Sequence, residues 1–502
     1  MLGSWHSLPP PLKAGFIFYL PVFVAACVLA PRLALPMPFL ERMAGRLRPW
    51  MGISVLTIIF MLTGLYWTFT GGAHSGDEGH YLIQAESLHA EGDLDIRNNL
   101  ENEMGSETVA QLGRYIFHVS PFSRGNHWHS FHPAGLPILL APLVPGGAAA
   151  RHFLLGLITA LTAFGAWRLC RRAGGTATAS ALAIAGFFGS LYGVVYASRC
   201  LPEMLGACLL VWLCWSVLAQ ADFPWRSAFL GGLSCAYLPW AHLRFYPLAL
   251  LGILFYGMFC AGTPEYPARK IRRIIIFLFI SIGGILFHKH IQNLMYEGGS
   301  AYAVSDVLFS HTEGLWHVFT DDVGLLNVFP LAAGLIAANI ILTFVAQKSG
   351  RRMAIVFGGM FGTAWLTSCG GGNYGGGAAL GGRFLLAVMP LLLPAAAALW
   401  HRISGPARWW LLLLALVSIA LCLMELICLP KLGRSFAFPY RELPLVAPLL
   451  SGLPTPFCGT AHAAVIGILT LCLLAVRRNL PAAVLAGLAV AATLIWQIAV
   501  RI

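Results

Sequence analysis

Runs of about twenty apolar residues recur along this chain, and they constrain its fold more than any other feature. A helix that crosses a bilayer core about 30 Å thick needs roughly 20 mainly apolar residues. Hydrophobic residues make up 58% of the chain and charged residues only 10%, whereas soluble proteins carry about 25% charged residues. The composition therefore excludes a soluble or a disordered protein and predicts an integral membrane protein.

About fourteen segments are long and apolar enough to be candidate spans. They lie at 14–34, 50–70, 149–170, 178–197, 201–220, 226–241, 244–262, 272–290, 325–346, 352–368, 383–400, 408–428, 460–476 and 481–500. The sequence thus predicts an all-α polytopic membrane protein of about 12–14 transmembrane helices, forming a single domain over 1–502.

The surplus of positive charge is an orientation signal. A net charge of +12 would suggest nucleic-acid binding in a soluble protein. Here lysine and arginine gather in alternate connections between candidate spans, and short loops rich in these residues face the cytoplasm. We therefore expect no nucleic-acid partner, and we expect 133–147 to stay on the outer side without crossing. The predicted outer loops are 71–132, 291–324, 369–382 and 429–459.

The loop 71–132 holds the first candidate site. Ser75 and Glu78 have the spacing of a capping box, in which Ser75 caps a helix and Glu78 bonds back to its start. Apolar residues follow with helical spacing, which predicts a short amphipathic helix on the membrane surface. Asp77 and Glu78 either stabilise this helix through its dipole or supply a carboxylate for chemistry at the lipid boundary.

Histidines are concentrated at the end of the same loop. His127, His129 and His132 can ligate a metal, or donate hydrogen bonds to a phosphate or a sugar. Their spacing matches no recognised zinc pattern, and the loop contains no cysteine. We therefore predict no metal and no cofactor, with a divalent metal as the alternative. A disulfide between Cys428 and Cys458 is a further option.

Cations at the outer ends of other candidate spans form the second group of candidates. Arg383 follows a glycine-rich run that includes Tyr374. Its planar fork suits a phosphate, and the alternative is that it reaches out to lipid headgroups. Arg199 is a further candidate for the phosphate, and the alternative is that it simply pairs with Glu203. His242 and Arg244 lie together at another outer end.

Short stretches of the chain carry a family resemblance. They run over 77–82, as Asp77-Glu78-Gly79-His80-Tyr81-Leu82, and over 92–94, 132–142, 324–330 and 381–385. With the acidic loop on the outside, they resemble the GT-C superfamily of integral-membrane glycosyltransferases, in particular its protein O-mannosyltransferase and lipid A aminoarabinose transferase branch. One difference is the apolar run 14–34, because the family usually has its acidic loop after the first span.

The resemblance implies an inverting glycosyltransferase that uses a polyprenyl phosphate-linked donor. The acceptor would be a hydroxyl of a lipid-linked glycan, a cell-envelope polymer or a protein, at the periplasmic face of a bacterial inner membrane. Inversion needs one carboxylate as a base, which assigns Asp77, with Glu78 orienting the acceptor or the helix end. Arg383, and then Arg199, His242 and Arg244, would bind the donor phosphate. The acceptor or sugar would contact His127, His129, His132 and Tyr374.

Two other functions remain open from the sequence. A transporter or flippase for lipid-linked glycans usually has charges near the bilayer midplane and paired broken helices, whereas the charges here lie near the outer boundary. A glycan polymerase or ligase with a diphosphate-linked donor would use similar outer loops. All three functions place the protein among membrane lipids.

Overall fold

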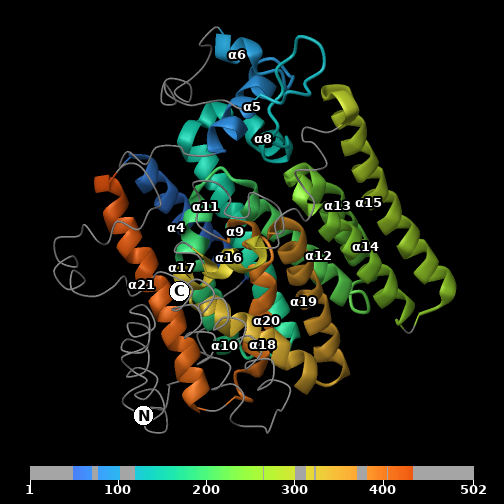
Figure 1. Cartoon of the computed structure of the whole chain (residues 1–502). Coiled ribbons are helices and arrows are strands. Elements are labelled where there is room, and N and C mark those ends of the chain that lie inside the picture. Colours follow the sequence, from blue (N-terminus) through green and yellow to red (C-terminus); the bar gives the residue numbers. More distant parts are fainter. Residues whose placement is uncertain are drawn as a thin grey trace.

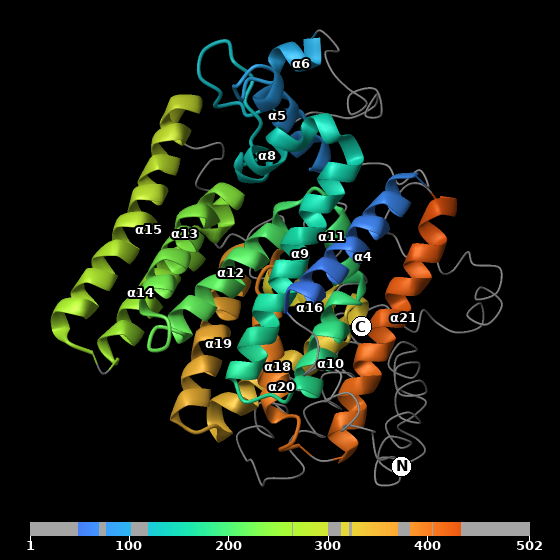
Figure 2. The same ribbon diagram turned by 180° about the vertical axis from the view of Figure 1, so that it is seen from behind.

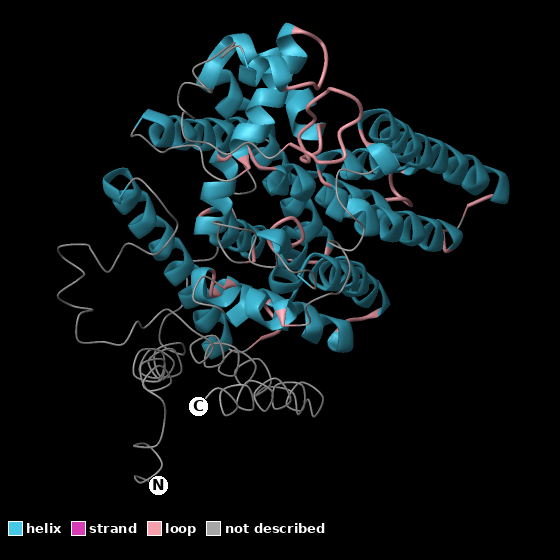
Figure 3. Ribbon diagram, turned by 45° about the horizontal axis from the view of Figure 1, so that its top comes forward, coloured by secondary structure: helices cyan, strands magenta, loops and turns pink. Residues whose placement is uncertain are grey.

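The computed structural model describes residues 49–69, 77–101, 119–263, 265–299, 313–320, 324–369, 382–403 and 405–432. In this part of the chain every regular element is a helix, and the extended pairings are two isolated bridges (Figure 3). The predicted all-α fold is therefore confirmed. The spans expected at 14–34, 460–476 and 481–500 lie outside the described residues, as do Tyr374 and Cys458, so the disulfide between Cys428 and Cys458 stays a prediction.

The helices, in chain order, begin with α4 (Pro49–Phe69), α5 (Glu78–Ala90), α6 (Arg97–Glu101), α8 (Gly135–Leu140), η1 (Ala141–Gly146), α9 (Gly147–Arg172), α10 (Ala177–Phe188) and α11 (Leu191–Ser198). They continue with α12 (Pro202–Leu218), α13 (Pro224–Ala241), η2 (Leu243–Phe245), α14 (Tyr246–Ala261), α15 (Pro267–Met295) and η3 (Glu297–Gly299). The remainder are α16 (Gly314–Thr320), α17 (Leu325–Val328), α18 (Leu331–Val345), α19 (Lys348–Cys369), η5 (Arg383–Leu385), η6 (Met389–Leu392), α20 (Leu393–Leu399) and α21 (Gly405–Leu432).

Several of these helices can cross a membrane. Within the described ranges, three helical runs are long and apolar enough to do so: Gly135–Arg172, Leu243–Ala261 and Pro267–Met295. A fourth span results if α10 and α11, which meet at a bend of 63°, cross together. Shorter apolar helices accompany them, and α15 exposes most of its apolar side chains. These features are those of an integral membrane protein, while the total of about 12–14 spans stays a prediction.

One end of the molecule is built from the first loop. Figure 1 shows α5, α6 and α8 gathered above the long helices α9, α12 and α13. Figure 2, which views the molecule from behind, shows α4 lying along α9, and these two helices are in extensive contact. We call this end, where α5, α6 and α8 lie, the loop end. The segment 133–147 forms α8 and η1 there and packs against α5, without crossing the bundle separately.

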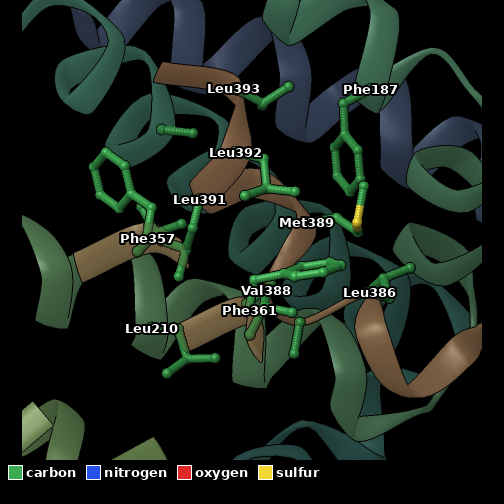
Figure 4. Packing of buried hydrophobic residues seen from close by; sticks show 14 of the residues in the cluster. Phe187, Leu210, Phe357, Phe361, Leu386, Val388, Met389, Leu391, Leu392 and Leu393 are labelled. Atoms are coloured by element: carbon green, nitrogen blue, oxygen red, sulfur yellow. The ribbon is translucent and has the colours of Figure 1, made fainter. Parts of the chain in front are cut away.

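The segment expected to be one span at 383–400 is broken, so that prediction is wrong. It consists of the short turns η5 and η6 followed by α20, and Arg383 therefore opens a single 3₁₀ turn. Pro390 and Pro394 explain the breaks, because proline lacks the N–H that a continuous helix needs. Figure 4 shows side chains of this segment packed among Phe187, Leu210 and Phe357. The core thus holds the backbone that follows Arg383.

The helix α5 differs from the amphipathic surface helix that the sequence predicts. It starts at Glu78 with Asp77 as its N-cap, and its residues from Glu78 to Ala85 are all buried. The physical reason is that α8 and η1 pack against it, and that the loop before α8 supplies Phe131 and His132 as further neighbours. The Glu78 carboxylate reaches across to the connection between α11 and α12, where it contacts Arg199 and the Cys200 N–H, while Ser75, its expected capping partner, lies outside the described residues.

A glycine sets the distance between α8 and α13. A Cβ atom added at Gly135 would lie 2.3 Å from the Trp240 carbonyl oxygen. Gly135→Ala should therefore lower the free energy of unfolding by about 1–3 kcal/mol, as overpacking does. Thermal unfolding in detergent measures this effect. Gly257→Ala is the matched control, because no atom lies within 4 Å of the added Cβ, and an unchanged Gly135→Ala variant would contradict the close packing.

Candidate functional site

Six charged side chains meet at the loop end, and we call them the charge cluster. They come from the start of α5, the C-cap of α11, the first turn of α12, and the turns η2 and η5. The members are Asp77, Glu78, Arg199, Glu203, Arg244 and Arg383. The sequence distributes these residues over more than 300 positions, and the fold brings them together in four ion pairs, three linked through Arg383 and Glu203 and one separate pair, Glu78–Arg199.

Arg383 bridges two carboxylates. Its Nε donates a hydrogen bond to Glu203 Oε1 at 2.6 Å, and its Nη2 donates to Asp77 Oδ2 at 2.7 Å. The side chains of Arg383 and Glu203 are 4% and 1% exposed, whereas that of Asp77 is 31% exposed. Gly382 precedes the arginine with a positive φ of 74°, a conformation that glycine adopts without strain. Asp77 is thus the accessible partner of a buried arginine.

Glu78 makes a separate ion pair with Arg199. The same carboxylate accepts a hydrogen bond from the Cys200 backbone N–H at 2.9 Å. The possibility that Arg199 pairs with Glu203 is therefore not realised. Arg199 is extended, with φ −96° and ψ 139°, and Pro202 opens a new helix, so the two side chains do not share one helix face. The pair Glu78–Arg199 joins the start of α5 to the connection between α11 and α12.

Arg244 approaches the cluster from η2. Its Nη1 lies 3.7 Å from Glu203 Oε1, the same oxygen that Arg383 contacts. The guanidinium carbon lies 3.6 Å from the centre of the Phe384 ring, a distance typical of a cation–π contact. His242 accepts from Arg244 Nε at 3.1 Å through Nδ1. The two arginines therefore lie side by side over one buried carboxylate.

His132 lies beside the accessible carboxylate. Its Nε2 is 3.7 Å from Asp77 Oδ1, its Nδ1 is 3.5 Å from the Tyr81 hydroxyl, and its ring lies against those of His80 and Phe131. Burial lowers the pKa of His132 to about 3, so the imidazole is neutral at neutral pH. Burial tends to raise the pKa of Asp77, but Arg383 outweighs it and the pKa falls to about 2. Asp77 is thus a carboxylate at neutral pH.

The structure separates the other two candidate histidines from the cluster. His127 Nδ1 lies 2.6 Å from Asp95 Oδ2, and His129 Nδ1 lies 3.1 Å from the Leu94 carbonyl oxygen. Both are therefore bound to the segment that follows α5 rather than to the arginines. Among the residues that the structure describes, no three His, Cys, Asp or Glu side chains are grouped as metal ligands.

Glu203 is the residue that the sequence argument missed as a site residue. It was considered only as a partner for Arg199, yet it contacts Arg383 and Arg244. Its second oxygen, Oε2, is buried and has no hydrogen-bond partner among the described residues. The available signal was its position, because a carboxylate in the first turn of an apolar membrane helix is costly and needs a cation nearby.

The fold and the site define a helical membrane protein with a buried carboxylate–arginine cluster at one end. The chain matches no protein-family model, and no curated protein is similar to it in sequence. Among solved structures, it is similar to ArnT from Cupriavidus metallidurans in the apo state, with 15% identity, a TM-score of 0.48, and coverage of 90% of this chain and 76% of that one.

A second structure, of ArnT from the same organism bound to undecaprenyl phosphate, gives a comparable result. The identity is 15%, the TM-score is 0.48, and the alignment covers 88% of this chain and 75% of that one.

Proposed function

We propose that the protein is an inverting glycosyltransferase that transfers a sugar from a polyprenyl phosphate-linked donor to a hydroxyl acceptor. The observation that carries the proposal is the pair Asp77–Arg383, a partly exposed carboxylate and a buried arginine joined at 2.7 Å. An acceptor hydroxyl needs a base, and a leaving phosphate needs a cation. The charge cluster supplies the base, Asp77, and the cation, Arg383, in direct contact with each other.

Asp77 is the proposed base. It is the accessible acid of the cluster, since Glu78 and Glu203 are 2% and 1% exposed. The acceptor oxygen forms a bond to the anomeric carbon while the bond from that carbon to the phosphate oxygen breaks. The bonding electrons go to the phosphate, and the hydroxyl proton goes to the Asp77 carboxylate. A single displacement of this kind inverts the anomeric configuration and needs no second nucleophilic carboxylate.

Arg383 and Arg244 are the proposed phosphate ligands. They flank the same oxygen of Glu203, so one phosphate can contact both guanidinium groups. Arginine binds phosphate oxygens through parallel N–H groups, and a fixed pair of cations stabilises the charge that develops on the leaving group. The reaction as proposed needs no cofactor. Arg199 is engaged by Glu78, and we assign this pair to positioning Asp77 at the start of α5.

A lipid chain has an apolar place to lie along α11, the helix whose C-cap is Arg199. A cavity of about 580 Å³ is lined by α4, α9, α10, α11 and Ile419 of α21. Its lining is almost wholly apolar and includes Val194 of α11, the helix whose C-cap is Arg199. We assign this cavity to the prenyl chain of the donor, because the cavity is apolar and one of the helices that line it, α11, ends at the charge cluster.

The sugar and its acceptor would approach Asp77 from the loop end. His132 is neutral there and can donate a hydrogen bond to either substrate. The acceptor is then a lipid-linked glycan, a cell-envelope polymer or a protein. The lysine and arginine pattern of the loops supports a loop end on the periplasmic side of a bacterial inner membrane.

The test is sugar transfer by the purified full chain in lipid nanodiscs. Labelled polyprenyl phosphate sugars are incubated with hydroxyl acceptors, and we expect release of polyprenyl phosphate together with an inverted glycoside. Use of diphosphate-linked donors alone would indicate a polymerase or ligase instead. Movement of an intact donor across proteoliposomes, without cleavage, would indicate a flippase and overturn the proposal.

A further inference from the structure

We propose that Asp77 occupies, in the ligand-free protein, the position on Arg383 that the donor phosphate takes. Donor binding then displaces the carboxylate, so that loading the donor and releasing the base are one event. This inference rests on the proposed function and deepens it. It also gives Glu203 a role, as the anchor that keeps Arg383 in place during the exchange.

The two carboxylates on Arg383 differ in how easily they can leave. Glu203 is 1% exposed and its Oε2 has no hydrogen-bond partner among the described residues. Its departure from Arg383 would strand a buried charge, which is strongly unfavourable. Asp77 is 31% exposed and can turn toward the opening of the site. The exchangeable partner of the guanidinium is therefore Asp77, on Nη2, while Glu203 stays on Nε.

Repulsion between anions at one guanidinium favours the displacement. Three carboxylates and three arginines give the cluster no net charge, with His132 neutral. A phosphodiester donor adds one negative charge and competes for the same N–H groups. Arg383 already contacts two carboxylates, so a phosphate next to a fixed Asp77 would be a third anion on one guanidinium, and like charges at that distance repel.

His132 provides a place for the displaced carboxylate. Its Nε2 lies 3.7 Å from Asp77 Oδ1 and has no hydrogen-bond partner among the described residues. A rotation of the Asp77 side chain that releases Arg383 can bring these two atoms, now 3.7 Å apart, within hydrogen-bond distance. The carboxylate then keeps one polar contact and faces the space where an acceptor hydroxyl enters.

The same exchange in reverse favours product release. After transfer, Asp77 carries the acceptor proton and the polyprenyl phosphate holds Arg383. When Asp77 loses this proton to water, its carboxylate again competes for Nη2 of Arg383. The returning carboxylate displaces the phosphate and restores the ligand-free arrangement.

The test is the affinity for undecaprenyl phosphate, measured on the full chain in detergent. Asp77→Asn removes the competing charge, so we expect the Kd to fall roughly tenfold, as the loss of one charge-assisted hydrogen bond implies. Asp222→Asn is the matched control. Asp222 also pairs with an arginine at 2.6 Å, but beyond the other end of α12, and its removal should leave the Kd unchanged.

An unchanged or raised Kd in a folded Asp77→Asn protein would overturn the exchange and leave the proposed function standing. Failure of the wild-type chain to bind undecaprenyl phosphate any better than undecaprenol would overturn both.

A second measurement on the wild type needs no variant. Arg383, His132 and Arg244 are the charged or titratable groups that lower the pKa of Asp77 in the free protein. Once Arg383 binds the donor phosphate instead of Asp77, the pKa of Asp77 should rise. The kcat profile should therefore fall at acidic pH where kcat/KM is still flat, since kcat reports the donor-bound protein. If kcat and kcat/KM fell at the same acidic pH, the result would contradict the exchange.

Discussion

Replacing Asp77 with asparagine is expected to reduce sugar transfer by roughly 10²–10⁴-fold, the usual contribution of a general base. Asparagine has nearly the shape of aspartate but cannot accept the acceptor's proton. The rate is measured as release of polyprenyl phosphate under donor-saturating conditions, so that a change in donor affinity does not obscure it.

The matched control is Glu91→Gln, which removes an exposed acid from the other end of α5. It should retain full activity, because Glu91 lies outside the charge cluster. Undiminished transfer by Asp77→Asn would exclude Asp77 as the base. Loss of transfer in both variants would show that the effect comes from the loop as a whole rather than from one carboxylate.

Replacing Arg383 with glutamine is expected to affect both stability and ligand binding. Glu203 would lose its 2.6 Å partner while remaining buried, with only Arg244 left at 3.7 Å, and breaking a buried ion pair in this way costs up to about 3–5 kcal/mol. Thermal unfolding in detergent should show the loss of stability, and binding of undecaprenyl phosphate should be lost as well.

A double variant separates these two effects. Arg383→Gln combined with Glu203→Gln removes both charges, so much of the stability should return, since neutralising a buried pair costs far less than stranding one member. Phosphate binding should stay lost, because the guanidinium is still absent. A double variant that binds undecaprenyl phosphate as tightly as the wild type would show that Arg383 is structural only.

The sequence predicted the positions of most described helices, because apolar runs of sufficient length are visible without tertiary information. It failed where local signals were outweighed. The segment 383–400 is apolar enough to be one helix, yet Pro390 and Pro394 break it. The helix α5 has the composition of a surface helix, yet the later segments α8 and η1 bury it.

The residues of the charge cluster could be proposed from the sequence, but their pairing could not. Asp77 and Arg383 each stood out as an isolated charge at a lipid boundary, where charges are rare and costly. Nothing in a single sequence connects two residues 306 positions apart. Proximity along the chain also suggested the wrong partner for Arg199, since Glu203 is near in sequence while Glu78 is the actual neighbour in space.

The ion pair between Glu203 and Arg383 has a consequence for how the protein is made. The two residues are 180 positions apart, and synthesis at about 5–20 residues per second leaves roughly 10–40 s between them. During that interval α12 enters the membrane with a carboxylate whose main partner does not yet exist. Arg244, which emerges earlier and lies 3.7 Å from Glu203, can hold that charge until Arg383 arrives. Arg244, proposed to bind phosphate in the folded protein, thus first neutralises Glu203 during synthesis.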